Sequence, residues 1–143
     1  ADQLVLEVTE SELAAESQTA ITNLHTLRDR GVRIAIDDFG TGYSSLSYLG
    51  RLPLDKIKID QSFVKTLPAS AEAGAIIRAV MTLADTLDKI VVAEGIETAD
   101  QAWMLRMMGC QVGQGYHYGR PRTGAEMVAW FQNRGTELRP MRA

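Results

Sequence analysis

The sequence predicts an α/β fold, an incomplete (β/α)8 barrel of the TIM type with about five of the eight β/α units. Strand-like apolar segments alternate with helix-like segments, and the connections between successive strands are long enough for parallel pairing. Polar residues also stand at or just after the strand ends, as they do in barrels whose chemistry gathers at the C-terminal ends of several strands. An open, doubly wound sheet is the competing architecture, but it would concentrate such residues at a single switch point.

Three strands are predicted in the N-terminal half, at residues 4–8, 32–36 and 57–59. A capping box formed by Thr9 and Glu12 begins the first helix, and Gly31 ends it. A glycine-rich turn follows the second strand. A short helix is then predicted over residues 44–52, where Pro53 stops it.

Two more strands are predicted in the C-terminal half, at residues 90–93 and 110–114. The first of them is apolar throughout, which is typical of a parallel strand buried on both faces. Residues 70–87 have the apolar spacing of a long helix. Thr98 with Gln101, and Thr123 with Glu126, form the capping boxes of two further helices.

Composition excludes several classes of function. The formal net charge is −3 and no cluster of Lys and Arg accompanies aromatic residues, so polymeric nucleic acid is not expected as a partner. No apolar run reaches the ~18–20 residues of a membrane span, so direct membrane insertion is not expected and any anchor would lie outside this sequence. The single cysteine, Cys110, excludes an internal disulfide framework and fits a reducing compartment, which indicates a cytoplasmic domain.

Acidic residues recur at the predicted strand ends, and this pattern indicates a metal site. They are Glu7, Asp37, Asp38, Glu94 and Glu97. At one barrel mouth these carboxylates would repel one another strongly without cations, and Mg²⁺ or Mn²⁺ prefers such an all-oxygen environment. Two adjacent aspartates on one turn can bridge a pair of metal ions, the arrangement used for in-line displacement at phosphorus.

Each of these carboxylates has an ordinary explanation when it is taken alone. Glu7 can be a solvated strand end, and Asp37 with Asp38 can form a turn and an N-cap. Glu94 and Glu97 can be acids that the helix dipole favours in a first turn. Their recurrence at successive strand ends is what favours a site.

Two further features extend the candidate site. Lys58 stands between two isoleucines and therefore faces the barrel interior. An unpaired lysine there would be costly, so it is predicted to pair with the site carboxylates or with a metal-bound water. After the last strand, Arg120 and Pro121 can either contact a ligand or simply end the loop, and the residues alone leave both explanations open.

Five segments, taken in their order along the chain, carry a resemblance to a known family. They are Leu6-Glu7-Val8-Thr9-Glu10, Asp37-Asp38-Phe39-Gly40-Thr41-Gly42-Tyr43-Ser44-Ser45-Leu46, Lys58-Ile59-Asp60, Glu94-Gly95-Ile96-Glu97, and Gln114-Gly115-Tyr116 followed by Arg120-Pro121. Together they resemble the EAL family of cyclic-di-GMP phosphodiesterases over essentially the whole chain. The resemblance implies a (β/α)8 barrel and Mg²⁺- or Mn²⁺-dependent hydrolysis of one phosphodiester bond of cyclic di-GMP, giving linear pGpG.

The same resemblance implies a role for each matching residue. Glu7 would bind the first of two metal ions, Asp37 would bridge both, and Asp38 would hold the second. Lys58 would orient the attacking water, and Glu94 would act on the second metal ion and on that water. Lys58, Glu94 and Asp38 are accordingly the expected catalytic residues.

The remaining matches imply supporting roles. Glu97 and Gln114 would support the second metal ion and the substrate, and Arg120 with Pro121 would lie on the substrate side. Glu10 would steady the loop over residues 38–46, which in this family also contributes to dimerisation. A homodimer through the loop after Asp38 is therefore expected.

The sequence departs from the family pattern before Glu7. The Glu-Ala-Leu strand and the metal-binding Asn of the family have no counterpart in residues 1–143. The chain is therefore expected to be the C-terminal portion of one EAL barrel domain, inactive by itself, within a parent that hydrolyses cyclic di-GMP. A non-catalytic cyclic-di-GMP receptor or regulatory dimerisation module is the alternative, which loss of the upstream Glu or Asn would favour.

Overall fold

A single curved sheet organises the chain. The computed structural model describes residues 1–14, 18–42 and 49–134. Its parallel strands lie side by side in sequence order: β1 (Val5–Thr9), β2 (Arg33–Phe39), β3 (Lys56–Ile59), β4 (Ile90–Ala93) and β5 (Val112–Gly113). Sequential parallel neighbours joined by helical crossovers form part of a (β/α)8 barrel, as the sequence predicts.

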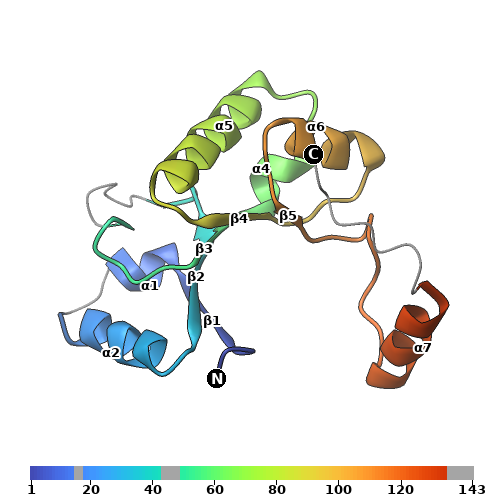
Figure 1. The fold of residues 1–143 in the computed structure, drawn as a ribbon. Coiled ribbons are helices and arrows are strands. Elements are labelled where there is room, and N and C mark those ends of the chain that lie inside the picture. Colours follow the sequence, from blue (N-terminus) through green and yellow to red (C-terminus); the bar gives the residue numbers. More distant parts are fainter. Residues whose placement is uncertain (15–17, 43–48, 135–143) are drawn as a thin grey trace.

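Helices cover the convex side of this sheet (Figure 1). The described helices are α1 (Glu10–Ala14), α2 (Gln18–Asp29), α4 (Gln61–Lys65), α5 (Ala71–Thr86), α6 (Ala99–Met107) and α7 (Gly124–Arg134), of which all but α7 lie on this side. In Figure 1, α1, α2 and α5 lie along the strands, whereas α7, in red, stands apart from the sheet. In the part of the chain that the structure describes, no helix combines the length and the apolar character that a bilayer crossing requires.

Local hydrogen bonds explain where several helices begin. The Glu12 carboxylate accepts the Thr9 amide at 3.0 Å, and the Glu12 amide donates to the Thr9 hydroxyl at 3.3 Å. Thr123 and Glu126 repeat this reciprocal pattern before α7. The Ser70 hydroxyl accepts a backbone amide at 3.1 Å and caps α5. These helix starts agree with the sequence predictions.

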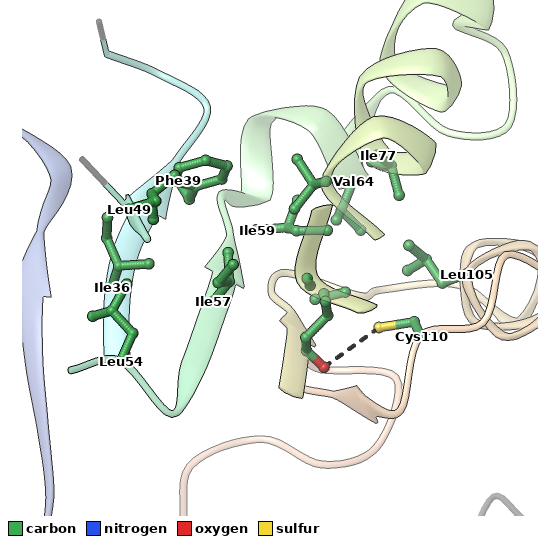
Figure 2. Packing of buried hydrophobic residues seen from close by; sticks show 14 of the residues in the cluster. Ile36, Phe39, Leu49, Leu54, Ile57, Ile59, Val64, Ile77, Leu105 and Cys110 are labelled. Carbon is green, nitrogen blue, oxygen red and sulfur yellow. Dashed lines mark hydrogen bonds between the residues drawn. The ribbon is translucent and has the colours of Figure 1, made fainter. Parts of the chain in front are cut away.

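The two faces of the sheet carry different side chains. On the convex face, Ile36, Ile57 and Ile59 pack against the helices as part of one hydrophobic core (Figure 2). On the concave face, the register places Glu7 beside Ala35 and Lys58 beside Val92. Because side chains alternate along a strand, the isoleucines and Lys58 must point to opposite faces.

Cys110 belongs to the apolar core. Its side chain is buried, and Sγ lies 3.2 Å from the Val112 carbonyl oxygen and 3.9 Å from that of Val91 (Figure 2). Burial raises the pKa of this thiol, so it stays protonated at neutral pH.

Two strands differ in length from the prediction. β2 continues through Asp37 and Asp38 to Phe39, because Phe39 pairs with β3 after a register shift. β5 is short, because only Val112 and Gly113 pair with β4. The acidic pair therefore lies within the last residues of a strand and not beyond its end.

The helices also show differences. α4 was not predicted; it begins after Asp60, whose carboxylate accepts the Ser62 amide at 2.9 Å. The stretch predicted as one helix up to Gly31 is described as α1 and α2, with residues 15–17 outside the described part. The helix predicted over residues 44–52 lies largely outside the described residues, which resume at Leu49.

Candidate metal and substrate site

Carboxylates from three strands converge on one lysine. Lys58 Nζ lies 2.7 Å from Glu7 Oε2, 2.9 Å from Asp37 Oδ1 and 2.8 Å from Glu94 Oε1. The topology explains this convergence, because Glu7 lies on β1, Asp37 on β2 and Lys58 on β3, while Glu94 directly follows β4. One point on the concave face therefore carries three acidic groups around a single ammonium.

Lys58 is the most enclosed member of this group. Its side chain is 8% exposed, against 17% for Glu94, 22% for Asp37 and 49% for Glu7. Desolvation by burial lowers the pKa of Lys58, but hydrogen bonds to Glu7, Glu94 and Asp37 outweigh it and raise that pKa above its ordinary value. The lysine is therefore charged at neutral pH, and three carboxylates against one ammonium make the group acidic.

Asp38 stands beside this group and does not contact Lys58 in the same way. Its backbone has a φ of 53°, a left-handed conformation that Asp tolerates better than most residues, and its amide donates to Asp37 Oδ1 at 3.0 Å. Partial desolvation of its carboxylate, followed by repulsion from Asp37 and Asp60, raises the pKa of Asp38. Its carboxylate lies near that of Asp60 at the start of α4.

A buried carboxylate holds the turn after β2. Glu10 is 2% exposed and accepts the amides of Gly40 at 2.9 Å and Gly42 at 3.3 Å. Gly40 has a φ of 101°, and a Cβ there would lie 3.0 Å from the Phe63 ring of α4. The described start of this loop is thus fixed between α1 and α4. The effect of Glu10 on residues 43–46, which lie outside the described part, stays a prediction.

A cavity of about 390 Å³ opens next to Glu94. Its walls come from the segments after β3, β4 and β5, namely Gln61, Lys65, Glu94, Gly95, Glu97, Gln114, Gly115 and Tyr116. The cavity therefore contains Glu97 and Gln114, the two residues predicted for the substrate side. Lys65 adds a cation to a wall that otherwise carries carboxylate and amide groups.

Glycines let the loops around this cavity approach one another closely. A Cβ on Gly95 would lie 2.6 Å from a side-chain atom of α4, and a Cβ on Gly115 would overlap the Ile96 backbone. The Ile96 amide donates to the Gln114 carbonyl at 3.1 Å, and the Ile96 carbonyl accepts the His117 amide at 2.9 Å. The segments after β4 and β5 thus form one hydrogen-bonded unit.

Not every predicted residue joins the lysine-centred group or this cavity. The Arg120 guanidinium lies 4.5 Å from the centroid of the Tyr116 ring, and Arg120 lines a second cavity of about 360 Å³ beside α7. Pro121 follows it in the irregular segment before α7. Neither residue lines the cavity beside Glu94.

Sequence reasoning assigned no role to three side chains of the cavity: Gln61, Lys65 and Tyr116. Gln61 and Lys65 are four residues apart and so share one face of α4, a helix that was not predicted. The available signal was Asp60, an N-cap residue type directly after a strand. Tyr116 stands in the last of the five segments that carry the family resemblance, but no role was assigned to it.

The acidic residues suit a hard cation by their chemistry, not by a preformed arrangement. Among the described residues, no group of three or more His, Cys, Asp or Glu side chains is gathered as a metal ion would require. Glu7, Asp37 and Glu94 instead direct their oxygens toward Lys58. Their all-oxygen donor set nevertheless matches the preference of Mg²⁺ and Mn²⁺.

A partial parallel barrel with an acidic group at its strand ends defines an α/β-barrel domain with its site on the concave face. Comparison with known proteins then gives the family. The chain belongs to the EAL domain family, which it matches over residues 1–121. This confirms the family that the sequence motifs indicate.

Curated relatives include two proteins of Pseudomonas aeruginosa. The cyclic di-GMP phosphodiesterase NbdA is 49% identical over 118 residues, which cover 82% of this chain and 15% of NbdA. The bifunctional diguanylate cyclase/cyclic di-GMP phosphodiesterase MucR is 44% identical over 126 residues, covering 88% of this chain and 18% of MucR. The chain thus spans less than a fifth of the length of these relatives.

Solved structures confirm the fold. The EAL domain of Mycobacterium smegmatis DcpA has a TM-score of 0.85 and 42% identity, over 92% of this chain and 59% of that one. The c-di-GMP complex of the PaMucR phosphodiesterase has a TM-score of 0.84 and 43% identity, over 88% of this chain and 51% of that one. A manganese/c-di-GMP complex of Klebsiella pneumoniae BlrP1 has a TM-score of 0.78 and 40% identity, over 84% and 31%.

Proposed function

We propose that the full-length protein containing this domain hydrolyses cyclic di-GMP to linear pGpG with two divalent metal ions, Mg²⁺ or Mn²⁺. The observation that carries this proposal is the convergence of Glu7, Asp37 and Glu94 on Lys58 at the strand ends. The PaMucR and BlrP1 complexes support it, because both contain c-di-GMP and the second also contains manganese.

Four acidic residues are assigned to the metal ions. Glu7 would bind the first ion, Asp37 would be shared, and Asp38 with Glu94 would bind the second. Cations bound there would supply Lewis-acid stabilisation of the charge that develops on the phosphoryl oxygens. The negative charge of the group around Lys58 favours their binding.

Lys58 and Glu94 are assigned to the attacking water, with Asp38 completing the catalytic set. The Lys58 ammonium is held by three carboxylates and can donate a hydrogen bond that fixes a water oxygen. The Glu94 carboxylate lies 2.8 Å from the same ammonium and can accept a hydrogen bond from that water. Orientation of the water by these two groups is the contribution of the chain itself.

The cavity beside Glu94 is assigned to one half of the substrate. Its volume of about 390 Å³ is near the lower end of the range of about 300–1,000 Å³ that ligand pockets occupy. Glu97 and Gln114 offer hydrogen-bonding groups, and Lys65 offers a charge that is complementary to a phosphate. Arg120 and Pro121 would flank the substrate beside Tyr116.

We also propose that the protein forms a homodimer through the loop after Asp38 and works in the cytoplasm. Glu10 fixes the described start of that loop because it accepts the amides of Gly40 and Gly42. A loop whose backbone is held in this way can form an interface with less loss of conformational freedom. The single cysteine in the sequence, Cys110, is typical of a reducing compartment.

The experiment is an assay of the full-length protein with cyclic di-GMP and Mn²⁺ or Mg²⁺, with chromatographic separation of the products. We expect pGpG to accumulate and a chelator to stop its formation. Binding of cyclic di-GMP without hydrolysis by the metal-loaded protein would overturn the enzyme assignment and favour a receptor. The absence of both binding and hydrolysis would overturn both assignments.

A further inference from the structure

We infer that Gln101 is a positioning residue of the cavity beside Glu94, because its side-chain carbonyl holds the turn that presents Glu97. This inference rests on the proposed function insofar as that cavity receives the substrate. Among the described residues, Gln101 is one of three buried polar or charged side chains, with Glu10 and Lys58. It does not line the cavity itself.

One side-chain oxygen of Gln101 accepts hydrogen bonds from two consecutive backbone amides. Gln101 Oε1 accepts the Glu97 amide at 2.9 Å and the Thr98 amide at 3.1 Å. A carbonyl oxygen has two lone pairs, so both bonds can form at full strength. The backbone of Glu97 is therefore held from inside the protein while its residue lines the cavity.

The same turn is also held on its N-terminal side. Ile96 is bonded through its amide to Gln114 and through its carbonyl to His117. Gly95 has a φ of 69° and changes the direction of the chain before Ile96. With both sides fixed, the backbone at Glu97 has little freedom, and loss of the Gln101 bonds would release one side of it.

Helix capping is the ordinary explanation for Gln101, and it accounts for the bond from the Thr98 amide to Oε1 but not for the bond from the Glu97 amide. In the capping box of α6, the Thr98 hydroxyl accepts the Gln101 backbone amide at 3.2 Å. Thr98→Ala removes this bond and leaves Gln101 Oε1 in place. Gln101→Leu keeps the Gln101 amide and removes Oε1. Gln101→Glu keeps an acceptor oxygen at a helix position that favours an acid.

Amide hydrogen exchange of the full-length protein tests the positioning without any substrate. Gln101→Leu should accelerate exchange at the Glu97 and Thr98 amides about tenfold, because two buried N–H groups lose their acceptor. Thr98→Ala and Gln101→Glu should leave the Glu97 amide protected. Unchanged exchange in Gln101→Leu would overturn the inference. If that variant does not fold, Gln101→Met serves in its place.

Steady-state kinetics with cyclic di-GMP then test the consequence. Gln101→Leu should raise KM about tenfold and change kcat by less than about twofold, because the turn orients substrate and not the attacking water. Thr98→Ala should leave KM unchanged even where its Tm falls, and Gln101→Glu should restore KM. Equal KM changes in Gln101→Leu and Thr98→Ala would overturn the inference. If the proposed function is wrong, the wild-type protein will show no turnover of cyclic di-GMP. In that case the hydrogen-exchange experiment alone decides whether Gln101 positions the turn.

Discussion

The three buried polar or charged side chains found among the described residues each hold one part of the site. Glu10 accepts the amides of the turn after β2, Lys58 binds carboxylates from three strands, and Gln101 accepts the amides before α6. Burying such groups is costly unless their partners are supplied. These three buried groups therefore lie where their hydrogen bonds and ion pairs fix the concave face and the cavity beside it.

Asp37 is the residue whose charge the proposed function needs most. Asp37 Oδ1 accepts the Asp38 amide and lies 2.9 Å from Lys58 Nζ, and the amide oxygen of an asparagine can keep both contacts. Asp37→Asn in the full-length protein should therefore preserve folding, but it should lower kcat roughly a thousandfold and weaken Mn²⁺ binding. Product formation and calorimetric metal titration measure the two effects.

The matched control for this substitution is Asp29→Asn at the exposed end of α2. It removes the same charge away from the concave face and should change neither turnover nor metal affinity. Normal turnover in Asp37→Asn would contradict the metal assignment, and global unfolding of that variant would instead make Asp37 a structural turn residue.

Asp38 should make stability depend on pH in a predictable direction. The pKa of Asp38 is higher in the folded state than its ordinary value of 3.8. Protonation of Asp38 therefore favours folding, and this contribution is complete at pH values below 3.8. That contribution is lost as the pH rises through the folded-state pKa, so ionised Asp38 opposes folding at neutral pH. Asp38→Asn should therefore raise Tm by about 2 °C at pH 7 in metal-free buffer.

The pH profile separates this effect from any change in the backbone. Asn tolerates a left-handed φ as Asp does, so the backbone contribution should be small and independent of pH. The gain in Tm should become smaller as the pH falls toward 3.8, the pKa of the aspartate in the unfolded chain. A gain of the same size at every pH would show that the ionisation of Asp38, opposed by desolvation and by repulsion from Asp37 and Asp60, is not its cause.

At the scale of elements, patterns that act locally were sufficient for most of the fold. The apolar strand over residues 90–93, the helix capped by Ser70 and the capping box of Thr98 with Gln101 all form as predicted. Long-range pairing decided the rest. Phe39 extends β2 only because it pairs with Ile59 of β3. The residues around Phe39 in the sequence do not indicate this partner.

The site shows the same division. Strand alternation was sufficient to place Lys58 on the concave face, and its pairing with carboxylates followed from the cost of a buried charge. The cavity was not predictable, because Gln61 and Lys65 reach it from the unpredicted α4. Gln101 was recognised only as a cap, because its further bond from the Glu97 amide depends on where the turn before α6 lies in space.

The close approach of the segments after β4 and β5 yields a prediction at this scale. A Cβ on Gly115 would overlap the Ile96 backbone, which cannot move without breaking its bonds to Gln114 and His117. Gly115→Ala should therefore lower the free energy of unfolding by about 3 kcal/mol. Gly119→Ala is the control, because a Cβ there would meet no atom within 4 Å. Denaturant titration should show a loss for Gly115→Ala alone, and equal losses would contradict the close approach.

At the scale of the whole molecule, the helices other than α7 lie on one side of a curved sheet (Figure 1). Apolar side chains are exposed at its edges and on α7: Leu4 beside β1 is 61% exposed, Val112 of β5 is 41% exposed, and Phe131 of α7 is 49% exposed. Such apolar exposure at the two outer strands and at α7 favours association with further protein surface.

The 143-residue chain, purified by itself, should therefore self-associate. Sedimentation velocity over a range of micromolar concentrations should show a rise in mean mass with concentration, because β1 and β5 each have one strand neighbour in the described sheet. Val112→Lys should reduce the association, since a charge on an outer strand opposes strand pairing. Val128→Lys, which adds the same charge on α7, separates association through that helix from association through β5. A monomer at every concentration would contradict the expectation that the exposed apolar side chains of β1, β5 and α7 drive association.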